Sequence, residues 1–326
     1  MSLEIEAKLN KIPIINWLVA LLKKVKLPAF EGLSLYDLIE MYLLGIVQGA
    51  LSARASSIAF SLFMALFPLL IFLVTLVPFI IPYASVGNEN FDAQFLLFLE
   101  SFLPTATSEY FGDIYQQIKN QQSGGLLSSA FFISIFLMAN GVNAIFGGFE
   151  NSYHIDLTRN FLRQYAYALM VGLILSILLI IGAAAYVYFE FYIVEYLSEW
   201  AAKTRGYDLT ENDIVGAQIG KILFFIILSY LTTAILYYFG TAEGKQAKFF
   251  SIGALMTTIL FLLTSYLFGV YVEKFARYNE LYGALGGLLI LMVFIWLNSN
   301  ILLLGFELNA SLNALRKNIE KDDEME

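Results

Sequence analysis

Polar side chains interrupt two of the most apolar stretches of the sequence. Asn140 and Asn143 are three residues apart in one of them. Asn298 and Asn300 lie in another, and Glu307 follows Asn300 by seven residues. Spacings of three and seven place side chains on about the same face of a helix. Amides and a carboxylate on such faces are suited to a polar pathway or a substrate contact inside a membrane. Hydrogen bonding between helices is the alternative, worth about 0.6 kcal/mol for a typical contact.

Three arginines are candidates for contact with an anionic head group. Arg54 precedes one apolar stretch, and Arg159 and Arg163 are four residues apart at the start of another. Basic residues beside a membrane attract anionic lipids. Two alternatives stay open: Arg54 anchors its helix by extending its charge to the interface, and Arg159 and Arg163 set the topology. For Glu307 the alternative to a pathway role is an ion pair with a basic loop at the inner interface.

The composition disfavours metal, thiol and nuclease chemistry. The chain has no cysteine, and His154 is its single histidine, so the sequence does not indicate a converging set of metal ligands. Its basic residues are few and scattered, without the aromatic interleaving that is typical of nucleic-acid sites. We therefore expect no enzyme activity, no cofactor, no bound metal and no nucleic-acid partner.

Six long apolar runs must position these side chains. Apolar residues make up 59% of the chain and charged residues 14%, whereas a typical soluble domain has about 45–50% and about 25%. A bilayer core needs about 20 residues of apolar helix, and backbone polar groups in lipid must bond within the chain. We therefore predict an all-α polytopic membrane protein with six transmembrane helices, near residues 56–82, 125–147, 161–188, 216–239, 249–271 and 283–306.

The distribution of basic residues predicts the orientation. Of the 19 Lys and Arg residues, thirteen fall before the first run, in the even-numbered connections or in the C-terminal tail, and five fall on the opposite side. Cytoplasmic loops carry the excess of Lys and Arg in membrane proteins. We therefore predict a multi-pass protein with both termini in the cytoplasm.

The remaining segments divide the chain around one membrane domain. Residues 1–31 form a basic lead, residues 32–312 the six-helix domain, and residues 313–326 a charged tail. A helix is predicted from Ser34 towards Ser52; it either lies as an amphipathic helix at the inner interface or packs under the bundle as a cap. Two acidic outer loops, 84–122 and 189–215, are predicted to lie on the other side, with short helices near 91–102 and 106–120 in the first.

Four stretches resemble a known family. They are residues 58–60 with 66–70, residues 102–104, residues 142–146, and the region that combines 281–283, Trp296 and 303–310. With these stretches the chain resembles the YihY/BrkB family of bacterial inner-membrane proteins, once labelled ribonuclease BN, over about residues 35–315. The resemblance implies six spans with both ends inside and a bacterial inner-membrane location. Asn298 replaces an aromatic residue that is often found after the family's tryptophan, and Asn143 lacks a basic neighbour.

Three functions are compatible with these features. The leading hypothesis is translocation or hand-over of an amphiphilic, anionic lipid or lipid-linked substrate, because polar side chains within spans accompany basic residues at the inner surface. A small-solute or ion transporter is an alternative that requires a polar path. A structural or assembly protein of the cell envelope is another, with the acidic outer loops binding a periplasmic protein partner. Membrane lipids are the partners common to all three.

Overall fold

Long α-helices make up the described part of the protein. The structure, a computed structural model, describes residues 21–24, 34–84, 124–152, 155, 158–188, 211–242, 248–274 and 284–323. Within these ranges the main elements are α3 (Leu35–Gln48), α4 (Leu51–Ala84), α7 (Gly124–Glu150), α8 (Phe161–Tyr188), α10 (Glu211–Gly240), α11 (Ile252–Lys274) and α13 (Ala284–Asp323). The prediction of an all-α protein is confirmed for these residues. The short helices predicted near 91–102 and 106–120, most of the basic lead and His154 lie outside them.

Among the residues that the structure describes, five helices are long and apolar enough to cross a membrane. Their apolar segments are Phe132–Glu150, Phe161–Gly182, Ile222–Gly240, Ile252–Val272 and Gly286–Ala314. The first predicted span falls within α4, whose Leu51–Leu66 segment is a shorter apolar helix among the described residues. The protein is thus an integral membrane protein with several spans, and the count of six stays a prediction. The last helix is longer than predicted, since α13 continues to Asp323 through most of the charged tail.

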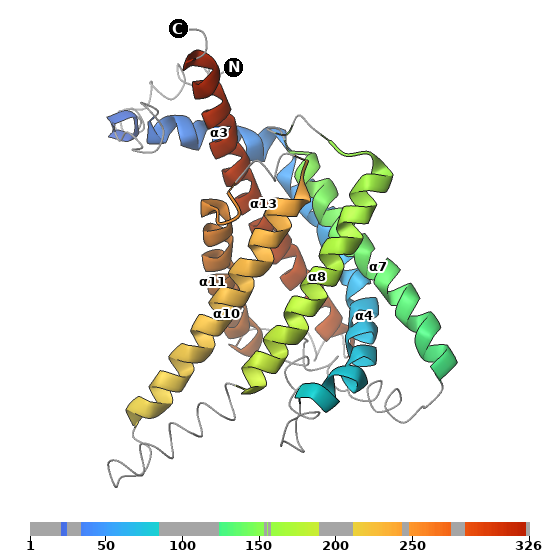
Figure 1. The fold of residues 1–326 in the computed structure, drawn as a ribbon. Coiled ribbons are helices and arrows are strands. Elements are labelled where there is room, and N and C mark those ends of the chain that lie inside the picture. The colour runs from blue at the N-terminus through green and yellow to red at the C-terminus, as the bar shows by residue number, and fades with distance from the viewer. Residues whose placement is uncertain are drawn as a thin grey trace.

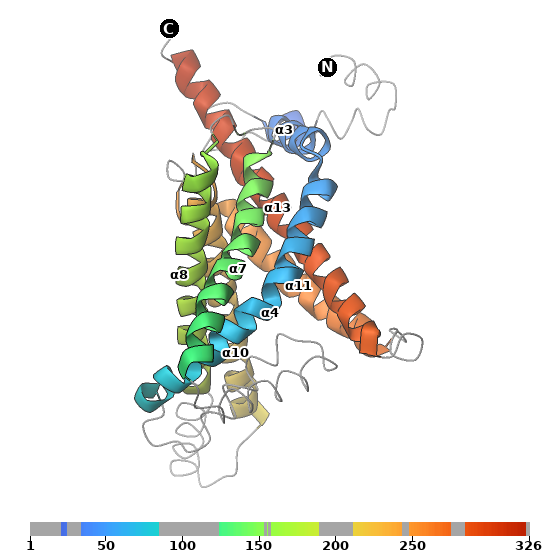
Figure 2. The ribbon, with the colours of Figure 1, turned by 90° about the vertical axis from the view of Figure 1, so that its right-hand side faces the viewer.

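The long helices form a bundle with α3 lying across one end (Figure 1). We refer to this end as the α3 end. Helix α7 packs between α4 and α8, α13 packs on α4 and α11, and α10 packs on α8 and α11. Figure 2 shows α4 and α13 crossing near the α3 end and separating towards the opposite end. The fully buried side chains Ile58, Phe146, Phe149 and Leu303 belong to one hydrophobic core cluster and come from α4, α7 and α13.

The chain breaks between α3 and α4, so the helix predicted from Ser34 towards Ser52 ends a few residues earlier than expected. Helix α3 begins at Leu35 as expected but ends at Gln48. Ala50 has φ 46°, a left-handed conformation that is uncommon for a residue with a Cβ. The backbone N–H groups of Ala53 and Arg54 then donate to the Ala50 carbonyl and begin α4. Arg54, four residues after Ala50, is buried and bonds to α7 and α13.

Helix α3 has one buried and one exposed face. Tyr36 is buried, whereas Leu43 and Val47 are 53% and 75% exposed. The helix packs on α13 and α4, as expected for a cap under the bundle. A position of its exposed face in the membrane interface stays a prediction.

Two glycines allow α11 and α13 to approach closely. A Cβ on Gly305 would lie 2.7 Å from the Gly253 carbonyl oxygen and 2.6 Å from the Tyr237 hydroxyl. Asn309, one turn further along α13, accepts a hydrogen bond from the Gly253 N–H at 2.8 Å and donates to Ser251 Oγ at 2.8 Å. Side chains from α13 therefore cap the first turn of α11, where N–H groups have no partner within the helix.

Candidate functional site

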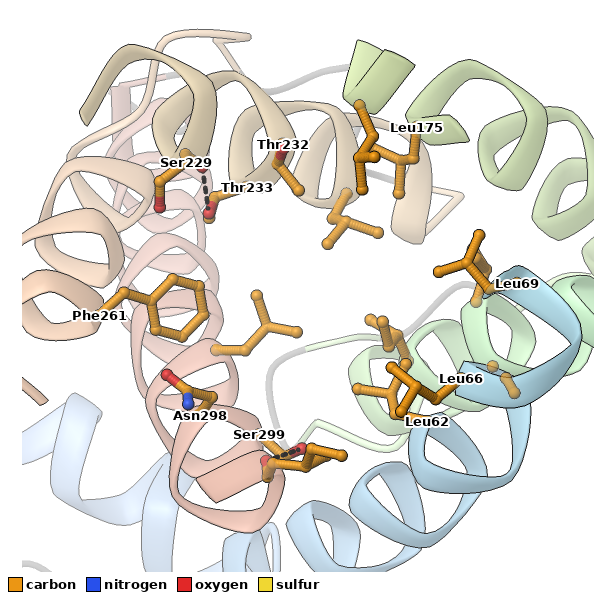
Figure 3. A pocket seen from close by; sticks show the side chains of 18 of the residues that line it. Leu62, Leu66, Leu69, Leu175, Ser229, Thr232, Thr233, Phe261, Asn298 and Ser299 are labelled. Atoms are coloured by element: carbon orange, nitrogen blue, oxygen red, sulfur yellow. Dashed lines mark hydrogen bonds between the residues drawn. The ribbon is translucent and has the colours of Figure 1, made fainter. Parts of the chain in front are cut away.

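A cavity of about 700 Å³ lies between the spans. Helices α4, α7, α8, α10, α11 and α13 all contribute to its wall (Figure 3). The lining consists mainly of Leu, Ile, Phe, Val and small residues, and none of the lining residues that the structure describes is charged. Its polar members are Ser176, Ser229, Thr232, Thr233, Ser265, Asn298 and Ser299. Ligand pockets typically have about 300–1,000 Å³ and a mostly apolar lining, so the cavity has the size and chemistry of a binding site.

Several polar groups of the lining bond to their own helix. Thr233 Oγ1 donates to the Ser229 carbonyl at 2.9 Å, a bond drawn in Figure 3. The hydroxyls of Ser176 and Ser299 likewise donate to backbone carbonyls four residues earlier in their own helices. Asn298 Nδ2 donates to the Phe294 carbonyl at 2.8 Å. Such local bonds satisfy the donors without help from a ligand. The wall therefore offers an apolar surface with few polar atoms directed at a guest.

An aromatic cluster packs next to the cavity lining, on the side of the α3 end. The rings of Phe149 and Phe306 stack with centroids 4.2 Å apart, and the Tyr237 ring packs edge-on against both. The Tyr237 hydroxyl donates to the Leu302 carbonyl at 2.6 Å and lies 2.6 Å from Thr257 Oγ1. Each of these residues follows a cavity-lining residue of its own helix by one turn or less, in the direction of the α3 end. The three lining residues are Ile145, Leu302 and Leu236. We call Phe149, Phe306 and Tyr237 the aromatic layer.

A buried ion pair lies beside the aromatic layer, since Gly148 and Glu307 are the sequence neighbours of Phe149 and Phe306. Arg54 of α4 donates through Nη2 to Glu307 of α13, and through Nη1 to the Gly148 carbonyl at 2.9 Å. Ser152 Oγ donates to the other carboxylate oxygen of Glu307 at 2.8 Å. The side chains of Arg54 and Glu307 are 8% and 0% exposed. The structure thus joins one predicted head-group residue to one predicted pathway residue, across 253 positions of sequence.

Helix α3 covers this pair. Burial raises the pKa of Tyr42 to about 12, and the negative charge of Glu307 adds to the shift. The Tyr42 hydroxyl therefore stays protonated at neutral pH. The pair is enclosed by α4, α7, α13 and α3, as expected for charges that stay in a low-dielectric region only when they are paired.

The other two predicted head-group residues differ in their surroundings. Arg159 donates to the Phe239 carbonyl at 2.8 Å and to the Thr241 carbonyl, and its guanidinium lies 4.3 Å from the centroid of the Tyr167 ring. Burial lowers the pKa of Arg159, and the Glu150 carboxylate opposes this shift. Arg159 therefore caps the last carbonyls of α10.

Arg163 lies on the exposed surface one turn into α8. Among the described residues it makes no recorded hydrogen bond or ion pair. Of the three arginines, Arg163 thus has the most accessible side chain, and a contact with a head group stays a prediction for all of them.

The four asparagines do not form one pathway. Asn298 lines the cavity, whereas Asn140, Asn143 and Asn300 are absent from its lining. Asn140 is exposed on the outer surface of α7. Asn143 Oδ1 is buried without a hydrogen-bond partner in the described structure, and Asn300 Nδ2 donates to the Trp296 carbonyl at 2.8 Å. Their roles as pathway residues stay predictions.

Sequence reasoning missed five contributors to this region, three of which gave no distinctive signal. Ser152 lies in a connection that gave no signal, and Phe149 and Tyr237 are aromatic residues among many others in apolar runs. Gly305 and Asn309 could have been found, since both belong to the stretch that carried the family resemblance. Among the described residues, no group of three His, Cys, Asp or Glu side chains could hold a metal ion.

Comparison with known proteins identifies the family. The sequence matches the family described as Virulence factor BrkB over residues 45–326. The chain belongs to this family. The match covers every described element of the bundle except most of α3, so Arg54, Glu307 and the cavity all lie within the family domain. The resemblance seen in the sequence is thereby confirmed.

Named relatives of the BrkB family span several bacteria. The chain is 26% identical over 276 residues to the putative ribonuclease-like protein YfkH of Bacillus subtilis (strain 168), covering 81% of this chain and 91% of that one. It is 26% identical over 258 residues to a UPF0761 membrane protein of Coxiella burnetii (strain RSA 493 / Nine Mile phase I), covering 77% and 84%. A UPF0761 membrane protein of Alteromonas mediterranea is 24% identical over 298 residues, covering 87% and 90%. No solved structure matches the chain.

Proposed function

We propose that this BrkB-family protein translocates or hands over an amphiphilic, anionic lipid or lipid-linked substrate in the bacterial inner membrane. The observation that carries the proposal is the apolar cavity of about 700 Å³ lined by six helices. An acyl chain that moves from the bilayer into such a cavity exchanges one apolar environment for another, so its transfer costs little free energy. The protein is thus suited to accept the part of a lipid that a polar pore would reject.

The same lining argues against the small-solute or ion transporter. An ion that enters a channel needs carbonyls or charged groups to replace its hydration shell. The described residues of the cavity wall include no charged side chain, and several of their polar groups are bonded to their own helices. A hydrated ion would therefore lose more hydration free energy on entering the cavity than it gains from contacts with the wall.

The cavity also argues against a purely structural or assembly role, since a scaffold needs no space of this size inside its bundle. Protein interiors are close-packed, with few voids larger than a water molecule. A partner on the periplasmic side, both termini in the cytoplasm and the absence of enzyme activity remain part of the proposal, and the charge distribution supports the orientation.

Lipid translocation in proteoliposomes tests the proposal. Purified protein is reconstituted with a trace of fluorescent phosphatidylglycerol or phosphatidylcholine, and the outer-leaflet fraction is followed with a membrane-impermeant quencher. We expect faster equilibration of the anionic probe than in protein-free liposomes. Equal rates with and without folded protein, for both lipids, would refute the lipid function.

A further inference from the structure

The position of the Arg54–Glu307 pair relative to the cavity suggests a second part of the site. Arg54, Ile58 and Leu62 follow one another at four-residue spacing on α4, and Leu62 lines the cavity. At about 1.5 Å of rise per residue, Arg54 lies roughly 12 Å from the lining along the helix axis. Glu307 lies roughly 8 Å beyond the lining residue Leu302 by the same measure. An amphiphile with its chain in the cavity would carry its polar end towards this pair.

Not every hydrogen-bond donor of the Arg54 guanidinium has an acceptor in the described structure. It donates to Gly148 and Glu307, but Nε is buried and has no hydrogen-bond partner in the described structure. Ser311, one turn after Glu307 on the same side of α13, likewise has a buried hydroxyl without a partner there. Arginine presents its donors as a planar fork that matches carboxylate or phosphate oxygens in pairs. A phosphate-type anion could accept hydrogen bonds from Nε and Nη2 together, whereas Glu307 accepts a hydrogen bond from Nη2 alone.

Glu307 holds the place that such an anion would take. It is fully buried, and its second oxygen is fixed by Ser152. A carboxylate and a phosphate ester compete for a guanidinium because both are oxygen anions of similar geometry. Arg54 and Glu307 are absent from the lining of the cavity, so the described conformation keeps the arginine apart from it.

We infer that Arg54 is the binding site for the phosphate-type anionic group of the substrate, and that Glu307 is an internal competitor that occupies this site when no substrate is bound. The inference rests on the proposed lipid function. Binding of the anionic group releases Glu307 from Arg54, and displacement of Phe149 and Phe306 joins the ion-pair region to the cavity. No covalent step is involved, because the exchange replaces one oxygen anion on the guanidinium by another.

The competition predicts how a change at Glu307 alters affinity. When a binding-competent state is only partly populated, the apparent affinity falls by that fraction. A pair that is open in about one molecule in ten or fewer weakens binding about tenfold or more, and Glu307→Gln removes the competing charge. We therefore expect Glu307→Gln to bind an anionic lipid at least about tenfold more tightly than the wild type, and zwitterionic lipid equally well.

Calorimetric titration of the full-length protein in neutral detergent tests this expectation. The probes are short-chain phosphatidylglycerol, short-chain phosphatidylcholine and inorganic phosphate. Glu150→Gln is the matched control, since it removes one carboxylate at the same end of the bundle without touching Arg54. The double variant Arg54→Gln/Glu307→Gln removes both charges together and leaves neither buried alone, which keeps the test valid if a single variant folds poorly.

Two results support the inference, and they identify the source of the anion. Tighter binding of phosphatidylglycerol alone by Glu307→Gln assigns the site to a lipid head group, and tighter binding of inorganic phosphate as well assigns it to the phosphate group itself. In both cases the double variant should bind the two lipids alike. Unchanged affinity in folded Glu307→Gln, or a preference for phosphatidylglycerol that persists in the double variant, would overturn the inference. Translocation by the wild type is measured separately, so failure of the ion-pair exchange is distinguishable from failure of the lipid function.

Discussion

Substitution of Gly305 by alanine tests the close crossing of α11 and α13, which forms one side of the cavity. The new Cβ would lie 2.6 Å from the Tyr237 hydroxyl and 2.7 Å from the Gly253 carbonyl oxygen, and would also overlap Thr257 Oγ1. A backbone carbonyl cannot turn away as a side chain can, so the two helices must separate. Separation also breaks the contacts of Tyr237 with Thr257 and with the Leu302 carbonyl.

The magnitude follows from three terms. Overpacking costs about 1–3 kcal/mol, and the loss of a hydrogen bond at Tyr237 costs about 0.5–1.5 kcal/mol. Replacing glycine by alanine inside a helix returns about 0.5–1 kcal/mol. The net loss is about 0.5–4 kcal/mol. With about 2 cal/mol/K of unfolding entropy per residue, the melting temperature of this chain should fall by roughly 1–6 °C.

Thermal unfolding of purified protein in detergent measures this loss, and Gly269→Ala on α11 is the matched control. A Cβ on Gly269 would meet no atom within 4 Å, so this variant should be as stable as the wild type or slightly more stable. The reasoning is refuted if Gly305→Ala melts at or above the temperature of Gly269→Ala.

Three further predictions concern the contacts at the α3 end of the bundle. Arg54→Gln should destabilise the protein by about 3–5 kcal/mol, because it leaves the buried Glu307 without its cation. The double variant Arg54→Gln/Glu307→Gln should melt at a higher temperature than Arg54→Gln alone. A lower melting temperature for the double variant would contradict the pairing. Asn309→Ala should cost about 0.5–2 kcal/mol through loss of the α11 cap, and Asn309→Asp, which keeps the oxygen acceptor, should cost less in the same melting experiment. Arg159→Gln should lower the melting temperature through loss of its bonds to the end of α10. Arg163→Gln should leave the melting temperature unchanged and weaken binding to vesicles that contain phosphatidylglycerol. Equal melting temperatures for the two variants would contradict the assigned roles.

The helices could be predicted because lipid allows few alternatives. The run predicted at residues 161–188 coincides with α8, and the start predicted at Ser34 lies next to the observed start of α3. Backbone groups in an apolar run must bond within the run, so its length alone gives the helix. The break at Ala50 was missed since a left-handed alanine has no strong sequence signal and the apolar spacing continues across it.

The site could be predicted only in part, because spacing gives the face of one helix and not its partner. Glu307 was singled out as a carboxylate near a span and Arg54 as a basic residue before one, but nothing in a single sequence links positions 253 residues apart. The cavity had no signal at all. Its wall is composed of the same apolar residues as the lipid-facing surface, and only the packing of six helices separates the two.

Filling the cavity tests the central claim most directly. Thr232 of α10 lines the cavity (Figure 3), whereas Ile227 of the same helix is 58% exposed on the outer surface. Translocation of fluorescent phosphatidylglycerol is compared in proteoliposomes that contain wild type, Thr232→Phe or Ile227→Phe at equal protein density. The account predicts that Thr232→Phe slows translocation towards the protein-free rate and that Ile227→Phe leaves it unchanged. Equal rates for wild type and a folded Thr232→Phe variant would contradict a lipid path through the cavity.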